Sequence, residues 1–272
     1  MTLAGKTLFI TGASRGIGRE IALRAARDGA NIVIAAKSSE PHPKLSGTIH
    51  SVAKEVEATG GRALALKVDV RDEASVTEAL RTSAEHFGGI DALINNAGAI
   101  RLTGVEGIEV SRFDLIHAVN TRAVLICSKA ALPYLKKSSE GHILNLSPPL
   151  NLALKWFAPH APYTLTKYGM SMLTLGMSEE FKKYGVCVNS LWPTTLIATA
   201  AVEFEVGDGE ESLKAARTPA IMAEAAHAIL SGRRTGMLFT DEQVLRDQGV
   251  ASFDQYQVGP SGTLLLKDLF ID

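Results

Sequence analysis

Apolar residues follow two alternating patterns along the chain. Short runs that are apolar almost throughout predict β-strands buried on both faces of a sheet. These runs lie at residues 7–11, 31–36, 63–70, 92–95, 142–146, 186–191 and 237–240. Apolar residues at helical spacing predict the main helices between them, at residues 19–28, 48–59, 73–87, 113–136 and 163–184.

This alternation predicts an α/β fold, because strands followed by helices pair in parallel through right-handed crossovers. We expect a single-domain, Rossmann-like, doubly wound parallel sheet of about seven strands, flanked by helices on both faces. It would span residues 1–272, with a small C-terminal extension at 237–272. Two irregular loops, 37–47 and 147–162, follow strand ends, where such sheets bind ligands, and are therefore candidate walls of a binding site.

A glycine-rich segment follows the first predicted strand and opens a helix. Gly12 and Gly16 lack a Cβ, so they permit a tight turn and a close approach of backbone N–H groups to a pyrophosphate, while Gly18 lets the helix pack closely on the strand. A purely structural turn could carry the same glycines, but the strand-turn-helix context favours dinucleotide binding. The candidate cofactor-binding residues here are Thr11, Gly12, Ser14, Arg15, Gly16, Ile17 and Gly18.

The residues after the second predicted strand indicate which nicotinamide cofactor is bound. NAD sites usually carry an acidic residue there, about 20 residues beyond the glycines, to bind the ribose 2′-hydroxyl. This chain instead has Lys37, which together with Arg15 would attract a 2′-phosphate. Lys37 could also be an ordinary solvated loop residue, so the missing carboxylate is the stronger argument. We expect NADP(H) to be favoured over NAD(H).

A tyrosine and a lysine stand four residues apart at the start of the last long predicted helix. Tyr163 and Lys167 therefore lie on one face, one helical turn apart. A phenol has a reference pKa of about 10, but a nearby cation stabilises the phenolate and lowers that pKa. The same spacing also occurs by chance, as a packed aromatic residue beside a solvated amine. The pair is a candidate acid/base site whose weight depends on the other motifs.

Taken together, these motifs resemble the short-chain dehydrogenase/reductase family. Asp69, the segment Asn95-Asn96-Ala97-Gly98, Asn120, the Tyr163/Lys167 pair, and Asn189 with Pro193 occur in the family's order, over nearly the whole chain. Residues 33–37, 145–152 and 167–172 more narrowly resemble the hydroxysteroid dehydrogenase-like protein 2 group. Members of that group can carry a C-terminal sterol-carrier domain, and we expect this chain to end before one begins.

The resemblance implies a role for each matching residue. Tyr163 would be the general acid/base, Lys167 would tune it and bond the nicotinamide ribose, and Asn120 would anchor a water that passes protons to solvent. Asp69 and Val70 would hold the adenine. Further implied cofactor contacts are Asn96, Ala97, Gly98, Pro193 and Thr195. Structural alternatives are a helix cap for Asp69, a helix-backbone partner for Asn120 and a simple turn at 96–98.

The chain departs from the family pattern at two positions. The family binds the substrate oxygen with the second serine of a Ser-Ser pair, whereas this chain reads Ser147-Pro148, and proline has neither a hydroxyl nor an N–H. Either Ser147 takes over this role, which we favour, or Tyr163 alone holds the oxygen. Thr194 follows Pro193 where the family has glycine. Because of Pro148, a nicotinamide-binding redox sensor or scaffold with little turnover is the alternative function.

We therefore expect an NADP(H)-dependent oxidoreductase that interconverts an alcohol and a carbonyl at CH–OH groups of a small molecule. Apolar side chains in two segments favour an apolar, lipid-like substrate, although they could equally cover the core. They are Leu150, Leu152, Leu154, Trp156 and Phe157, and Leu196, Ile197, Val202 and Phe204. As in the family, helices 113–136 and 163–184 would form the interface of a homodimer or homotetramer.

Composition narrows the possible partners. The 272 residues are 46% hydrophobic and carry a net charge of −1, which predicts a large core and gives no basic field for nucleic acid or anionic lipid. We expect no membrane span and no secretory signal, hence an intracellular, cytoplasmic protein. Two isolated cysteines predict free buried thiols. The seven histidines show no metal-ligand spacing, so no metal is expected.

Overall fold

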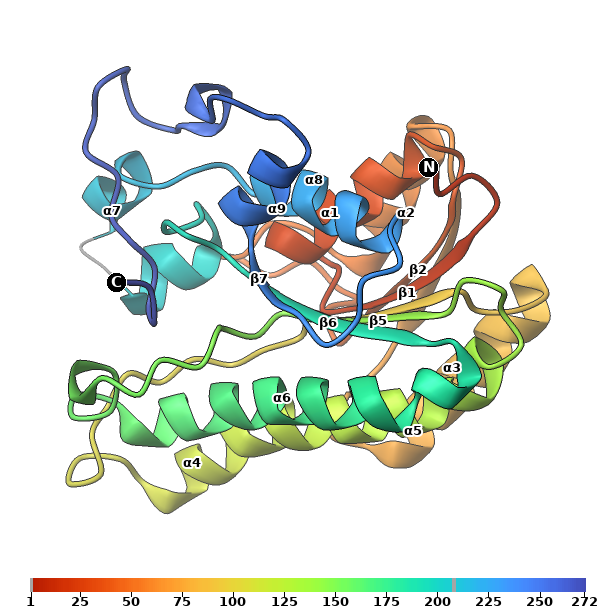
Figure 1. Ribbon diagram of the computed structural model, residues 1–272, viewed down its shortest axis with the longest axis horizontal. Coiled ribbons are helices and arrows are strands. Elements are labelled where there is room, and N and C mark those ends of the chain that lie inside the picture. The colour runs from red at the N-terminus through yellow and green to blue at the C-terminus, as the bar shows by residue number, and fades with distance from the viewer. Residues whose placement is uncertain (1, 207–208) are drawn as a thin grey trace.

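The structure, a computed structural model, describes residues 2–206 and 209–272. Over this part of the chain, seven parallel strands form one sheet in the order β3-β2-β1-β4-β5-β6-β7 (Figure 1). The predicted single-domain, doubly wound Rossmann-like sheet is confirmed. The strands are β1 Thr7–Thr11, β2 Asn31–Ala36, β3 Arg62–Lys67, β4 Ala92–Asn95, β5 His142–Asn145, β6 Cys187–Trp192 and β7 Leu238–Thr240.

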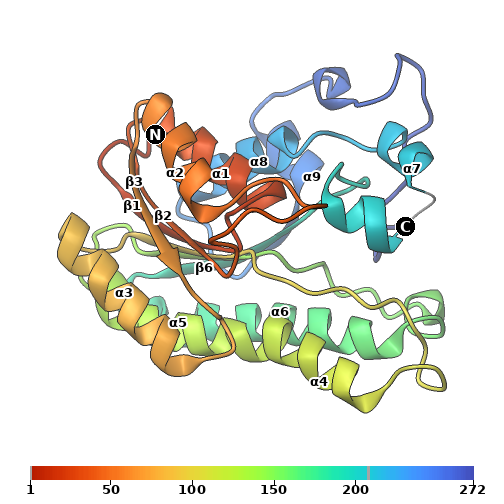
Figure 2. The same ribbon diagram turned by 180° about the vertical axis from the view of Figure 1, so that it is seen from behind.

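Helices cover both faces of the sheet, as Figures 1 and 2 show from opposite sides. One layer holds α1 Gly16–Ala26, α2 Ile49–Ala58, α8 Ala220–Leu230 and α9 Asp241–Asp247. The other holds α3 Glu73–Phe87, α4 Val110–His117, α5 Ala123–Leu135 and α6 Ala161–Glu180. A short helix, α7 Glu210–Lys214, precedes α8.

Alternate side chains of the buried strands enter different cores. Leu8 and Ile10 of β1 pack toward the layer of α1 and α8, whereas Phe9 packs toward the layer of α3 and α5. All five β1 residues are buried, because helices cover both faces. This explains why the strand sequences are continuously apolar rather than alternating.

The longest irregularity is in the helix predicted at 113–136. The structure gives a helix over Val110–Leu135 that contains a π-helical turn at Ala118–Arg122. By length and composition it could cross a membrane, with a mean hydropathy of 1.2, and 44% of its most apolar window is buried inside the protein. A core helix meets the same criterion, and Val124, Cys127 and Leu135 do belong to the core shared with α3 and α6.

Strand β3 ends earlier than predicted, at Lys67 instead of residue 70. Val68 still donates a backbone hydrogen bond to Ala36, and the chain then leaves the sheet. This turn brings Asp69 and Val70 to the carboxyl ends of the strands. The strand order reverses between β1 and β4, and in such sheets the crevice at that point is the usual ligand site.

Candidate active site

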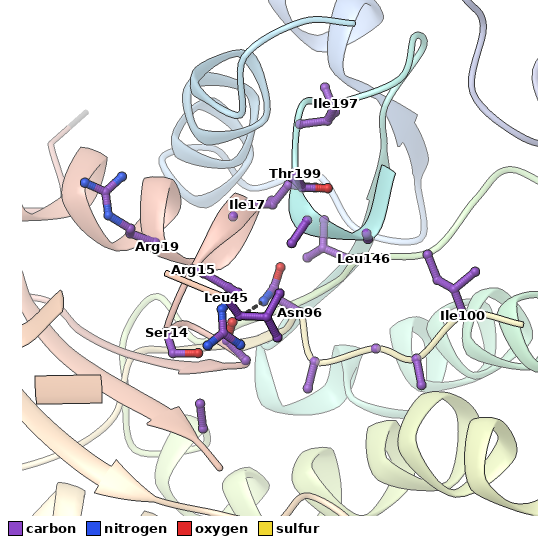
Figure 3. A pocket seen from close by; sticks show the side chains of 18 of the residues that line it. Ser14, Arg15, Ile17, Arg19, Leu45, Asn96, Ile100, Leu146, Ile197 and Thr199 are labelled. Carbon is purple, nitrogen blue, oxygen red and sulfur yellow. Dashed lines mark hydrogen bonds between the residues drawn. The ribbon is translucent and has the colours of Figure 1, made fainter. Parts of the chain in front are cut away.

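A cavity of about 1410 Å³ extends across the carboxyl ends of the strands. It is lined by the glycine segment, by the loop after β2, by Tyr163 and Lys167, and by the segment after β6. In the close view of Figure 3, Ser14, Arg15 and Leu45 lie near Asn96, while Ile100 and Ile197 lie farther along the pocket. The cavity thus joins the expected phosphate cradle to the expected catalytic pair.

The glycine segment forms a close backbone cradle. Gly12 has a φ of +67°, and a Cβ there would lie 2.8 Å from the Ala97 backbone. A Cβ on Gly18 would lie 2.4 Å from Asn96 Nδ2, which donates to the carbonyl oxygens of Thr11 at 2.8 Å and Gly12 at 3.1 Å. Side chains are therefore excluded where the loop meets the 96–98 turn. This room for backbone contact is what a pyrophosphate needs.

Two of the expected cradle residues act from behind the cavity wall. Thr11 Oγ1 accepts hydrogen bonds from the backbone N–H groups of Asn96 and Ala97, both at 3.0 Å. Neither Thr11 nor Gly18 is among the lining residues, so they shape the cradle. The other expected residues of the segment, Gly12, Ser14, Arg15, Gly16 and Ile17, line the cavity, as do Asn96, Ala97 and Gly98.

Basic side chains surround the end of the cavity beside the glycine segment. Arg15 bonds the carbonyl oxygens of Ser46 and Gly47, each at 2.9 Å, and so attaches the loop after β2 to the glycine segment. Lys37 is 62% exposed, with Nζ 3.4 Å from Asp69 Oδ2, and therefore remains available to a ligand. His42 and Lys44 also line this end, although the sequence analysis identified only their loop.

Asp69 and Val70 both line the cavity, and Asp69 lies next to Lys37 at this basic end. Arg71 pairs with the Asp69 carboxylate at 2.6 Å, and this contact holds the pKa of Asp69 well below its usual range. Asp69 is therefore an ionised acceptor beside the cavity. It does not cap α3, because Asp72 performs that function.

Tyr163 and Lys167 lie in the first turns of α6, and both are buried side chains that line the cavity. Lys167 Nζ donates to the Leu146 carbonyl oxygen at 2.6 Å and lies 4.8 Å above the Trp192 ring. Burial lowers the pKa of Lys167 to about 7. Burial, followed by the charge of Asp268, raises the pKa of Tyr163. The protein groups alone therefore favour the neutral phenol, which is a proton donor.

Asn120 lies in the π-helical turn and also lines the cavity. Its side chain accepts from Ala99 N at 2.9 Å and donates to Ala99 O and Thr166 Oγ1, both at 3.0 Å. These bonds connect the irregular helix to the loop after β4 and to α6. The side chain thus fixes the wall beside Tyr163, and π-turns of this kind frequently occur at functional sites.

Ser147 is fully buried and is not among the residues that line the cavity. Its hydroxyl has no hydrogen-bond partner within the described residues. Pro148 contributes a carbonyl that accepts from Ser171 Oγ at 2.6 Å and so attaches this loop to α6. The geometry therefore gives Ser147 no direct path to a ligand in the cavity, and its catalytic role stays a prediction.

The Pro193-Thr194 departure has a local explanation. Thr194 donates to Asp241 Oδ1 through its backbone N at 2.8 Å and through its hydroxyl at 2.7 Å. Asp241 begins α9, so the residue that replaces the family's glycine is held by a carboxylate from the C-terminal part of the chain. Pro193 lines the cavity, whereas Thr195, another expected cofactor contact, is buried and does not.

Of the two apolar segments expected around a substrate, the structure brings one to the cavity. Leu196, Ile197, Val202 and Phe204 line it. In the other segment, Leu152 and Leu154 are exposed and none of the five expected residues is among the lining. Trp156 and Phe157 instead pack around Phe270 and Tyr168.

The C-terminal tail returns to the site, which the sequence analysis did not predict. Phe270 is 1% exposed and lies within about 6.4 Å, ring centroid to centroid, of five aromatic rings, those of Trp156, His160, Tyr163, Tyr168 and Trp192. Asp268 and Leu269 line the cavity. The extension after Gly236 therefore supplies both the edge strand β7 and a wall beside Tyr163. An acidic residue inside the apolar run Leu264–Ile271 was the available signal.

The Phe270→Ala substitution is expected to undock this tail. A Phe-to-Ala change in a core costs about 3–5 kcal/mol, so amide hydrogen exchange at Asp268, which bonds Thr194 O, should accelerate at least about 100-fold. Leu264→Ala, in an 84% exposed position of the same tail, is the matched control and should leave the exchange unchanged. An unchanged exchange rate in Phe270→Ala would show that the ring does not hold the tail.

Among residues 2–206 and 209–272, no three His, Cys, Asp or Glu side chains are grouped so that they could hold a metal ion.

Solved structures with similar folds cover the whole chain. A dehydrogenase from Xanthomonas campestris is 49% identical with a TM-score of 0.96, covering 100% of both chains. A short-chain dehydrogenase from Mycobacterium thermoresistibile is 44% identical with a TM-score of 0.93, covering 100% of this chain and 96% of that one.

Sequence comparison gives a consistent assignment. Hydroxysteroid dehydrogenase-like protein 2 is 55% identical in Xenopus tropicalis and 53% identical in Homo sapiens, over 99% of this chain. The chain spans 64% of the length of these two relatives. The sequence model of the short chain dehydrogenase family matches residues 6–206. The chain therefore belongs to the short-chain dehydrogenase family.

Proposed function

We propose that the protein is an NADP(H)-dependent oxidoreductase that interconverts an alcohol and a carbonyl on an apolar substrate, with Tyr163 as general acid/base. The observation that supports this most directly is the continuity of one cavity from the glycine cradle to Tyr163 and Lys167. Membership of the family supports the reaction class, because short-chain dehydrogenases are nicotinamide-dependent oxidoreductases.

The residues present fit a nicotinamide dinucleotide. The cradle at Gly12 leaves no room for a Cβ, as a closely approaching pyrophosphate requires. Asp69 and Val70 would hold the adenine, Arg15 and Lys37 a 2′-phosphate, and Lys167 the ribose. When bound, the nicotinamide supplies or accepts the hydride.

Tyr163 would move the proton that accompanies this hydride. In the reducing direction its O–H donates to the carbonyl oxygen, and in the oxidising direction the phenolate accepts the proton of the alcohol. An ammonium at Lys167 favours the phenolate and so makes proton release from Tyr163 easier. The buried position of both groups excludes water and strengthens this effect.

An apolar substrate would occupy this same cavity. Leu196, Ile197 and Phe204 line it from the segment after β6, and Ile100 lines it from the loop after β4. Burial of such a wall against a hydrocarbon gains roughly 25 cal/mol per Å² of apolar surface. Aliphatic or lipid-like alcohols, aldehydes and ketones are therefore the proposed substrates.

We also propose that α5 and α6 form a subunit interface of a homodimer or homotetramer. Four large apolar side chains on these two helices are exposed to solvent in a single subunit, at positions where a monomeric protein would be expected to have polar residues. They are Leu125, Leu165, Met172 and Leu175. A second copy of the same helices is a complementary partner.

Cofactor preference can be tested through Lys37. If this amine binds the 2′-phosphate, Lys37→Ala should raise the Kd of NADPH about tenfold, the loss of about one charge-assisted hydrogen bond at a partly exposed position, and leave the Kd of NADH unchanged. Lys67→Ala, an exposed lysine at the end of β3 that does not line the cavity, is the control. Equal effects on both cofactors, or tighter binding of NADH by the wild type, would contradict the NADP(H) preference.

NADPH binding and NADPH consumption, measured side by side, distinguish an enzyme from a redox sensor. A carbonyl panel with NADPH should show consumption that depends on Tyr163. Cofactor binding without such turnover would instead favour the redox sensor or scaffold suggested by Pro148.

A further inference from the structure

An acidic side chain lies at the reacting end of the cavity, and nothing in the proposed reaction uses it. Asp268, from the C-terminal tail, lines the same cavity as Tyr163 and Lys167. The residues that follow it in the tail contact this end as well: Leu269 O accepts from Trp192 Nε1 at 2.8 Å, the Trp192 ring lies 4.8 Å from Lys167 Nζ, and Phe270 stacks on Tyr163. A carboxyl group here can therefore contact the same small molecule as the tyrosine.

Asp268 is held in place on both sides. Its backbone N donates to Thr194 O at 3.1 Å, and its carboxyl accepts from Leu269 N at 2.7 Å. Trp192 Nε1 donates to Leu269 O at 2.8 Å, which attaches the next residue to the end of β6. The carboxyl is thus fixed against the Trp192-Pro193-Thr194 wall and does not lie on a free chain end.

The chain also has Pro148 where the family has the serine that binds the substrate oxygen. Pro148 has no hydroxyl or N–H at the position where a donor to the substrate oxygen is expected. Ser147 does not line the cavity. Asp268 lines the cavity together with Tyr163, and the protonated form of its carboxyl can donate to an oxygen. A neutral carboxylic acid in an apolar site can serve as such a donor.

We propose that Asp268 is a second catalytic residue, whose carboxyl O–H donates a hydrogen bond to the reacting oxygen beside Tyr163. In reduction, hydride forms the new C–H bond, Tyr163 transfers its proton to the oxygen, and Tyr163 regains a proton from solvent. Asp268 transfers no proton. Its hydrogen bond stabilises the negative charge that develops on the oxygen as the carbonyl π-bond breaks.

The electrostatic surroundings favour the donor form. Desolvation and, to a smaller extent, the charge of Asp241 on α9 raise the pKa of Asp268 to about 8, although the backbone N–H of Leu269, the charge of Lys167 on α6 and the Trp192 side chain oppose the shift. Tyr163 on α6 is neutral at this pH, because its own pKa is raised. Asp268 is therefore mostly protonated at neutral pH and becomes a repulsive carboxylate as the pH rises through about 8.

The test compares Asp268→Ala with Asp268→Asn in the holoenzyme, since an amide can still donate but cannot ionise. This proposal rests on the proposed function, so Tyr163→Phe is measured in parallel with NADPH and the carbonyl panel. Asp268→Ala should lower kcat about 100- to 1000-fold at pH 7, and Asp268→Asn less than about tenfold. Asp272→Asn, an exposed carboxylate in the same tail, should match the wild type.

The pH profile separates a catalytic from a structural role. Wild-type reduction should slow as the pH rises through about 8, and Asp268→Asn should lose this decline. Lys167, whose pKa is about 7, titrates in both proteins; because the Asp268 charge raises this pKa, Asp268→Asn should move the Lys167 step to lower pH while it removes the step near pH 8. If Asp268 only held the tail in place, Asp268→Asn would lower the rate at every pH but would keep the decline near pH 8.

Thermal unfolding gives a second readout that needs no turnover. Between pH 3.8 and about 8 the folded protein retains a proton on Asp268 that the unfolded chain has lost, so the contribution of this group to stability falls with rising pH. Asparagine does not titrate. The Tm of Asp268→Asn minus that of the wild type should therefore increase across this range.

Each outcome bears on one idea. If Tyr163→Phe abolishes turnover, but Asp268→Asn keeps the wild-type decline near pH 8 and its Tm difference from the wild type does not change with pH, Asp268 is refuted while the proposed function stands. A loss of about 100-fold in Ser147→Ala alone would assign the oxygen to Ser147 and refute Asp268. If wild-type turnover is absent, or Tyr163→Phe retains it, the proposed function fails, and Asp268 with it.

Discussion

Replacement of Tyr163 by phenylalanine is expected to lower kcat by about 10³- to 10⁴-fold, the upper range for loss of a positioned acid/base. The substitution removes only the hydroxyl, so the ring should keep its stacking on Phe270, 6.4 Å away between ring centroids. Cofactor affinity and the melting temperature should therefore change little. Steady-state NADPH oxidation with a carbonyl substrate measures the effect.

A matched control is Tyr184→Phe, at an exposed tyrosine just beyond the end of α6. It should leave kcat unchanged. Residual activity of Tyr163→Phe above about a tenth of the wild-type rate would remove Tyr163 from proton transfer. In that case the cavity would need another acid.

Replacement of Lys167 by methionine is expected to lower kcat about 100- to 1000-fold and to weaken NADPH binding. Methionine preserves the length and much of the volume of the buried stem but lacks the ammonium. Two effects combine: the phenolate of Tyr163 loses its stabilising charge, and the ribose loses a donor. Fluorescence titration for Kd and steady-state kinetics for kcat separate them.

Lys182→Met, at an exposed lysine beyond α6, controls for loss of one positive charge and should behave as the wild type. Lys167 also bonds the Leu146 carbonyl, so the melting temperature of Lys167→Met must be measured as well. A folded Lys167→Met protein with wild-type kcat would contradict the role given to the amine.

The sheet could be predicted well from sequence because its signal is local. Strands β1, β2 and β4 match their predicted residues, since helices bury both faces and the sequences are continuously apolar. The largest error is at the end of β3, which serves the site. The prediction extended β3 through Val70, because apolar character alone does not show that the chain turns at Asp69.

The sequence predicted those residues of the candidate site that belong to motifs with fixed spacing. The glycines, Asn96 and the Tyr163/Lys167 pair lie together around one cavity. Asp268 and Phe270 could not be placed in the same way, because they are more than 100 residues from Tyr163 and belong to no spaced motif. Their position depends on the packing of Phe270 against rings from several segments.

The sequence alone could not decide whether Ser147 replaces the hydroxyl that is missing at Pro148. A neighbouring hydroxyl appeared able to replace the one missing at Pro148. In the fold Ser147 and Pro148 are both buried, and neither is among the residues that line the cavity, so the catalytic role of Ser147 stays a prediction.

The central claim is that Tyr163 delivers the proton while hydride passes between a nicotinamide and the carbon of an alcohol or carbonyl. The most direct test is a single turnover with NADPH carrying deuterium at the transferable position and an apolar aldehyde or ketone. We expect the wild type to form product with deuterium on the carbinol carbon. Tyr163→Phe should not form this labelled product at a comparable rate. Cofactor oxidation that leaves the product carbon unlabelled, or equal labelling rates in the two proteins, would contradict the claim.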